Sequence, residues 1–445
     1  MPDVIITEIK DSIKKAVDEN LSKIEKLTGD LVKSSNKVYI KPNGIDFKKH
    51  CFTSPEVLEA VILYFKEKGA EIYVMENSTQ SNATRIVFEV NGFKEVCKKT
   101  GATPIYLDED KTEIFQFKGK KSAEETDRGY NLKKFHLPKT VVEIMNKRDK
   151  ITYINLPKLK EHSMAGVTLG MKNQWGFPQH SDRGKDHNYN LHSKLVDVYE
   201  YIQPDLTLID ATEGTIHGHY PPTAWEDELV IPFNLIISGR DTLAVDVVGA
   251  CVFGLSIEEI PHLNIAYQRG LGEGDLNKIN VIGKDLSEYD KRYEWDLKQK
   301  FPENVKIIKG EDLLCREGCQ NNPLALLQIL AYDFKEKFEG GFFIIMGKGH
   351  DEGLIQKLKN EGFSKGLIAG YCAIDEVGEK IVEAFGKKNV HFSHDCNNLA
   401  ETSTALFKLS GVSPLDLIPI STLKLVWLIL LAKLHGSKAL IPSLF

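Results

Sequence analysis

Two lysines and a histidine occupy alternate positions of one short segment. Lys158, Lys160 and His162 follow the apolar run ITYINL (151–156), and Pro157 keeps the preceding residue extended. In an extended chain, alternate side chains point to the same side. Like charges side by side are unfavourable unless an anion or a metal neutralises them. The spacing therefore predicts a site for a carboxylate or phosphate, with His162 as acid, base or ligand. A solvated polar edge is the alternative.

The loop after this segment adds a further cation and an amide. A run of small residues, SMAGVTLG (163–170), leads to Lys172 and Asn173. Small residues allow the backbone to approach a ligand closely. We predict Lys160, His162 and Lys172 as catalytic residues, and Lys158 and Asn173 as substrate-binding residues.

Three other predicted strands also end in polar residues. In open α/β sheets, ligands bind beyond the carboxyl ends of the strands. Ordinary turn and cap chemistry is the alternative for each strand end. The predicted substrate-binding residues at these ends are Lys41 and Asn43 in KPNG, Glu76 and Asn77 in ENS, and Asp210 and Glu213 in DATEG.

Four cysteines fall at three predicted strand-to-helix junctions of the C-terminal part. They are Cys315, Cys319, Cys372 and Cys396. Such junctions converge on one edge of a sheet, so the four thiolates could hold an iron–sulfur (4Fe–4S) cluster or, alternatively, zinc. The spacing is not that of a ferredoxin, and small buried hydrophobic residues are the structural alternative.

Length and composition indicate a multidomain globular protein in a reducing compartment. The chain has 445 residues, a net charge of −6 and an odd number of cysteines. The charge gives no reason to expect nucleic acid. The N-terminus lacks the long apolar core of a secretory signal, so we expect a cytoplasmic protein with free or metal-bound thiols.

Strands alternating with helices predict an α/β fold of two domains with largely parallel sheets flanked by helices. We expect an N-terminal helix over 8–28, one continuous helix over 84–99, and a surface loop in the histidine-containing segment 177–193. The predicted divisions are a domain with the Lys/His site (1–283), a connector (284–312), a smaller domain with the cysteines (313–410) and an apolar tail (411–445).

The apolar tail contains LKLVWLILLAKL (423–434), which is too short to span a bilayer. A buried or dimer-facing helix is the favoured prediction, and interfacial membrane attachment is the alternative. We thus expect no membrane span, and a homodimer formed through this tail is one possible partner contact.

The motifs resemble the family called domain of unknown function 362. The resemblance is carried over about residues 37–283 by KPNG, LPKLKEHSMAGVTLGMKNQWG, DATEG and SGRDTLAVDVVGACVFG, in that order. The family is prokaryotic, and some members carry a ferredoxin-type iron–sulfur module, whose dense cysteine run is absent here. The His162–Lys172 interval is also distantly similar to nickel-pincer lactate racemases, in which a histidine precedes a cofactor-holding lysine. That similarity implies a two-domain enzyme with a cleft site.

Three functions fit these patterns. The first is an enzyme, such as a lyase, isomerase or oxidoreductase, that acts on a small anionic substrate in an interdomain cleft with an iron–sulfur cluster. The second is a non-catalytic iron–sulfur or metal carrier. The third is a zinc-stabilised binding module.

Overall fold

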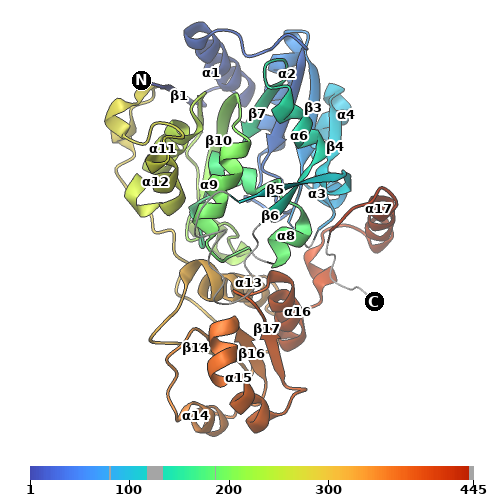
Figure 1. Cartoon of the computed structure of the whole chain (residues 1–445), viewed down its shortest axis with the longest axis vertical. Helices are drawn as coiled ribbons and strands as arrows, with labels where there is room; N and C mark the ends of the chain where they lie inside the picture. The colour runs from blue at the N-terminus through green and yellow to red at the C-terminus, as the bar shows by residue number, and fades with distance from the viewer. Residues whose placement is uncertain (80–81, 118–133, 186, 440–445) are drawn as a thin grey trace.

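The computed structural model describes residues 1–79, 82–117, 134–185 and 187–439, which form two α/β units stacked along the long axis (Figure 1). The larger unit runs from the N-terminus to β13 and the smaller one begins at β14. The predicted α/β class, with largely parallel sheets flanked by helices, is confirmed.

The larger unit is built on one mixed sheet with the strand order β13-β1-β12-β10-β7-β2-β3-β4. Strand β12 is antiparallel to both neighbours, whereas β10, β7, β2, β3 and β4 run parallel. The carboxyl ends of these parallel strands therefore lie at one edge. The strands are β1 (Asp3–Glu8), β2 (Lys37–Pro42), β3 (Glu71–Glu76), β4 (Thr103–Tyr106), β7 (Thr152–Leu156), β8 (Lys158–His162), β9 (Gly166–Val167), β10 (Leu206–Thr215), β11 (Val230–Ile231), β12 (Leu235–Gly239) and β13 (Asn280–Gly283).

Helices cover both faces of this sheet. Alternate residues along β2 point to opposite faces, so that Val38 and Ile40 pack against α1 and α2 while Tyr39 packs against α6 and α9. Helices α11 and α12 cover the sheet near β12. The helices are α1 (Ile13–Thr28), α2 (Pro55–Glu67), α3 (Thr84–Val90), α4 (Phe93–Thr100), α6 (Lys139–Asn146), α7 (Gly170–Asn173), α8 (His180–Lys185), α9 (Leu191–Tyr201), α10 (Glu226–Leu229), α11 (Thr242–Val252) and α12 (Pro261–Gln268).

The smaller unit has a parallel sheet of the order β14-β15-β16-β17. Its first strand lies inside the range predicted as a connector, where VKIIK (305–309) pairs with β15 in parallel register. Its elements are β14 (Val305–Lys309), α13 (Asn321–Asp333), β15 (Phe342–Met346), α14 (Leu354–Asn360), β16 (Gly366–Ala369), α15 (Tyr371–Phe385), β17 (Val390–Ser393) and α16 (Leu399–Ser410).

One predicted helix is confirmed and another needs correction. The helix predicted over 8–28 is observed as α1 (Ile13–Thr28), and it is preceded by β1, which was not predicted and which pairs with β12 and β13. The predicted helix over 84–99 is broken into α3 and α4 at Gly92, which has a φ of 77°. Strands β5 (Thr112–Gln116) and β6 (Lys134–Pro138) form the expected hairpin between 109 and 136, of which residues 118–133 lie outside the described part.

The C-terminal segment returns from the smaller unit to the larger one. Helix α17 (Thr422–Leu434) lies beside α3 (Figure 1). Its side chains Leu425, Leu428 and Ala432 pack against Ala83 and Ile86 at the start of α3. Its other face exposes apolar side chains: Leu423, Val426, Trp427, Leu430 and Leu434. No helix in the described part of the chain is long and apolar enough to cross a membrane. The homodimer through this tail stays a prediction, and residues 440–445 lie outside the described part.

Candidate functional site

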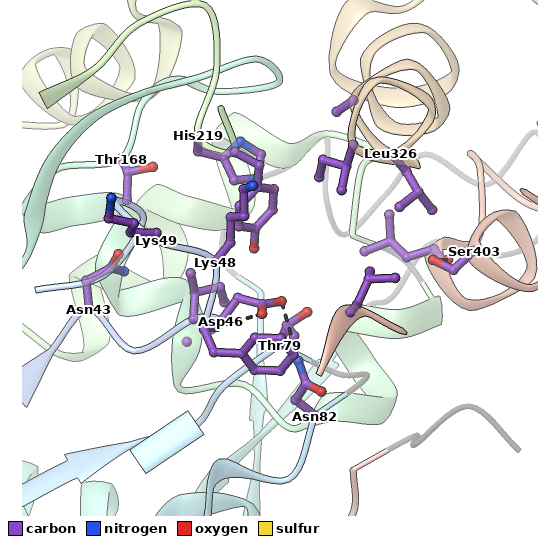
Figure 2. Close-up of a pocket in the computed structure, with 18 of the residues that line it drawn as sticks. Asn43, Asp46, Lys48, Lys49, Thr79, Asn82, Thr168, His219, Leu326 and Ser403 are labelled. Carbon is purple, nitrogen blue, oxygen red and sulfur yellow. Dashed lines mark hydrogen bonds between the residues drawn. The ribbon is translucent and has the colours of Figure 1, made fainter. Parts of the chain in front are cut away.

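A cavity of about 540 Å³ lies between the two units and is lined by both. Figure 2 shows Leu326 of α13 and Ser403 of α16 on one side, across from Asp46 and His219 of the larger unit. Lys48 helps to fix the two units, because its Nζ lies 2.5 Å from Asp333 Oδ2 on α13. Substrate sites commonly occupy such interfaces between domains.

Four buried cations line the part of the cavity that faces the large sheet. They are Lys41 at the end of β2, Lys160 on β8, Lys172 on α7 and Arg183 on α8. Lys172 is the most exposed of them, at 8 %. Buried charges require partners, because removing them from water carries a large cost in free energy. A buried cation that has no such partner therefore marks a place where negative charge is missing.

Lys41 is paired and held in place. Its Nζ lies 2.7 Å from Glu76 Oε1 and donates to Asn173 Oδ1 at 3.3 Å. The Asn173 side chain also accepts from Asn43 Nδ2 at 2.9 Å. A Cβ atom on Gly176 would lie 2.9 Å from the Lys41 Nζ and 3.0 Å from Glu76 Oε1, so a larger residue there would have to displace this ion pair. The predicted site residues Lys41, Asn43, Glu76 and Asn173 thus form one connected network at the cavity wall.

Lys160 and Lys172 are less well neutralised. The Lys160 ammonium donates to the backbone carbonyl of Cys51, and burial lowers the pKa of Lys160 to about 8. The Lys172 ammonium has no hydrogen bond or ion pair with any other described residue. Burial, reinforced by repulsion from Lys160, Arg183 and Lys41, lowers the pKa of Lys172 to about 7. Near neutral pH, Lys172 is therefore divided between its ammonium and free-amine forms.

His162 is a neutral imidazole at the same wall. Burial holds its pKa well below the usual value, with further lowering by His219 and Lys172. Its ring is stacked on that of His219, with 3.9 Å between ring centroids. The backbone N–H of Met164 donates to His162 Nδ1 at 3.2 Å, so the neutral ring carries its proton on Nε2. His162 can thus donate a hydrogen bond from Nε2–H to a bound molecule.

Comparisons with known proteins place this chain in a family. The sequence profile of the family described as "Domain of unknown function (DUF362)" matches residues 38–251. A thylakoid-associated protein of Synechocystis sp. is 30% identical over 257 residues, which are 55% of this chain and 70% of that protein. The chain belongs to the DUF362 family. The matched range includes the four cations and His162 and ends before the four C-terminal thiols.

One solved structure is similar to this DUF362 chain at a lower level. The lactate racemase apoprotein from Thermoanaerobacterium thermosaccharolyticum has a TM-score of 0.39 and 13% sequence identity. The alignment covers 92% of this chain and 86% of the racemase.

The remaining predicted substrate-binding residues lie outside the cavity lining. Lys158 Nζ lies 3.3 Å from Asp210 Oδ1 and 3.8 Å from Glu213 Oε1, and donates to Thr212 Oγ1. Asn77 donates to the carbonyl of Pro178. Lys158 and Lys160 lie close enough for Lys158 to lower the pKa of Lys160, but of the two only Lys160 lines the cavity. Between their partners Asp210 and Thr215, the pairing of β8 with β10 shifts register.

Several lining residues of this DUF362 site were not predicted from the sequence. The segment 177–193, predicted as a surface loop, buries Arg183 and places His187 at the cavity. Arg183 donates to the backbone carbonyls of Pro178 and Ser78 at 2.9 and 2.7 Å. Asp46, whose pKa burial raises to about 6, and Tyr220 also line the cavity. Only the three clustered histidines of that segment signalled it in the sequence.

Asp246 on α11 positions Lys172 and Asn173. Its two carboxylate oxygens accept from the backbone N–H groups of Gly170 and Met171, each at 2.7 Å. The short helix α7 thereby starts from a fixed point. The sequence indicated a helix start near Asp241, which does cap α11 through Ala244 N, but gave no sign of this longer-range contact.

We expect Asp246→Asn to weaken anion binding by roughly tenfold, because an amide can accept only one of these two hydrogen bonds. Isothermal titration with sulfate measures the loss. Asp241→Asn, which alters the cap of α11 but leaves α7 untouched, is the matched control. Equal sulfate affinity in wild type and Asp246→Asn would show that α7 needs no such support.

The four thiols lie on the side of the smaller unit that faces the larger one. Cys319 packs against Gly370, which precedes Cys372, and Gly318 lies near Cys315 and the backbone of Cys396. Asn188 of the larger unit donates to the Cys396 carbonyl at 3.1 Å. Among the described residues, however, no group of three or more His, Cys, Asp or Glu side chains is arranged to hold a metal ion. The iron–sulfur or zinc site stays a prediction, to be checked by iron, sulfide and zinc analysis of anaerobically purified protein.

Proposed function

We propose that this protein is an acid–base enzyme that isomerises or cleaves a small anionic substrate in the cavity between its two units. The Lys172 ammonium, which pairs with no other described residue and lies among three other buried cations at the cavity wall, carries this proposal. An anionic group bound there would supply the missing negative charge. The same site offers a lysine whose pKa of about 7 suits proton transfer near neutral pH.

The roles follow from the environment of each group. Lys41, Lys160 and Arg183 bind the carboxylate or phosphate of the substrate, with Asn43 and Asn173 holding Lys41 in place. The free amine of Lys172 removes a proton from the carbon next to the anionic group. The electron pair of the broken C–H bond moves onto the substrate oxygens, where the cations stabilise the added charge.

His162 completes the cycle as a donor. Its neutral Nε2–H donates a hydrogen bond to the negative oxygen and stabilises it. Return of the proton from the Lys172 ammonium to another carbon of the delocalised anion gives an isomerase. Transfer of the same proton from the Lys172 ammonium to a leaving group on the neighbouring carbon gives a lyase. Both reactions begin with the same exchangeable proton.

This shared step defines the test. The wild-type protein is incubated in D₂O with a panel of small carboxylates and phosphate esters, and deuterium incorporation is followed by mass spectrometry. We expect incorporation beside the anionic group of at least one compound, and a decrease by roughly 10²–10³-fold in His162→Gln, which loses the imidazole N–H that stabilises the negative oxygen.

His262→Gln is the matched control, because His262 is a buried histidine outside the cavity lining. Sulfate binding that persists in both variants would show that the anion site is intact. The proposal fails if the wild-type protein binds anions but exchanges no substrate hydrogen across a broad panel. The chain would then fit a binding protein better than an enzyme.

A further inference from the structure

The far part of the cavity is apolar. It is formed by apolar side chains from four separate helices, and the four buried cations lie in the other part of the cavity. They are Ile86 of α3, Leu326 and Ile329 of α13, Phe407 of α16, and Leu425 and Ile429 of α17. In Figure 2, Leu326 lies on the side of the cavity opposite His219 and Asp46.

This apolar wall is assembled from distant parts of the chain. Helices α13 and α16 belong to the smaller unit, α3 to the larger one, and the C-terminal segment returns across the interface to place α17 beside α3. Leu326, Ile329, Phe407 and Ile429 are only partly buried, whereas Ile86 and Leu425 are buried. Burial of the apolar surface that remains exposed would contribute about 25 cal/mol per Å². A hydrocarbon group bound against this wall would recover that free energy.

The size of the cavity also favours a ligand that carries a hydrocarbon group. A water molecule occupies about 30 Å³ in the liquid, whereas the cavity measures about 540 Å³. Acetate or inorganic phosphate bound at the cations would leave most of this space to water. A longer molecule with one charged end would fill both parts.

We infer that the substrate is an amphiphile, with a carboxylate or phosphate at the buried cations and a hydrocarbon tail against the apolar wall. This inference rests on the proposed function for its anionic end and adds the tail. The head group binds Lys41, Lys160 and Arg183 beside Lys172, and the tail extends between α13, α16 and α17.

Calorimetric titration of the full chain with anions of increasing length tests the inference. The pairs are acetate with decanoate and inorganic phosphate with decyl phosphate, each below its micelle concentration. One buried methylene group contributes about a fourfold gain in affinity, so we expect the ten-carbon member to bind at least ~100-fold tighter. A parallel arm uses phosphatidylcholine vesicles containing phosphatidic acid, and separates a dispersed amphiphile from a lipid taken from a bilayer.

Two variants locate the tail. Ser403→Trp places a large ring in the apolar part, and Leu326→Gln makes its wall polar. We expect each to reduce the advantage of decanoate over acetate at least tenfold. Thr404→Trp is the matched control, because Thr404 is the next residue of α16, is exposed and does not line the cavity.

The outcomes separate the inference from the function on which it rests. Tighter binding of the long anions, or binding to phosphatidic acid vesicles that Ser403→Trp abolishes, supports the tail site. Equal affinity for short and long anions, with no vesicle binding, overturns the inference but leaves the anion site standing. Failure of all anions to bind overturns both.

Discussion

Lys172→Met is expected to abolish turnover and, at the same time, to stabilise the folded protein. Methionine retains the length and apolar stem of lysine but has no amine to accept a proton. Loss of the proposed base should lower kcat by at least ~10²–10⁴-fold. The substitution also removes a buried ammonium that no described residue neutralises, so we expect unfolding to require about 1–4 kcal/mol more free energy.

The pH dependence of this stabilisation follows from the lowered pKa of Lys172. Between about 7 and the ordinary value of 10.5, the unfolded chain binds more protons than the folded one. Wild-type stability therefore gains from rising pH across this window, and below pH 7 the full cost of the buried charge remains. The advantage of Lys172→Met should be largest near or below pH 7 and should shrink as the pH approaches 10.5.

Urea denaturation at pH 6.5 and pH 9.5 measures the stabilisation, and the deuterium-exchange assay measures turnover. Lys150→Met is the control, because Lys150 is exposed and outside the cavity, and should change neither quantity. A Lys172→Met protein that is less stable than wild type at both pH values would mean that Lys172 has a structural partner.

The lowered pKa values of Lys172 and Lys160 predict the pH profile of the wild-type enzyme. Activity should rise as Lys172 loses its proton near pH 7 and fall as Lys160 loses its charge near pH 8. The dependence of kcat/KM, which reports the free enzyme, should therefore be bell-shaped. A bound anion favours the charged form of both lysines, so both limits of the kcat profile should lie at higher pH.

Much of the site could be predicted because it lies at the ends of parallel strands. Lys41 and Glu76 follow β2 and β3, which are neighbours in the sheet, and the two side chains form an ion pair. Asn173 reaches the same place through the small-residue loop, which lets α7 approach β2 closely. Strand order needs only local patterns and simple connection rules, so the sequence contains this information.

The rest depends on contacts that a sequence pattern does not encode. Arg183 and His187 lie in a polar segment without periodicity, and only packing against residues 77–78 and the smaller unit buries it. The apolar wall is formed by helices whose own periodicity indicates only that one face is buried. Whether such a face meets protein or a cavity is decided by tertiary structure.

Lys158→Met separates a structural lysine from the cavity lysines, and we expect it to destabilise the protein by about 3–5 kcal/mol. Lys158 and Lys160 are two residues apart on one strand, but only Lys160 lines the cavity. Burial alone would raise the pKa of Asp210, yet Lys158 and the Ser54 N–H hold it below its usual value. Without Lys158, the fully buried Asp210 carboxylate loses its counter-charge.

The double variant Lys158→Met/Asp210→Leu tests this assignment. Replacing both members of a buried pair by apolar groups removes the uncompensated charge, so most of the lost stability should return. Urea denaturation of the two variants measures the recovery, and sulfate titration of the double variant should remain within about threefold of wild type. If these variants instead lost much of their sulfate affinity but none of their stability, Lys158 would be a residue that binds the anion. A lysine with that role alone does not stabilise the fold by neutralising Asp210.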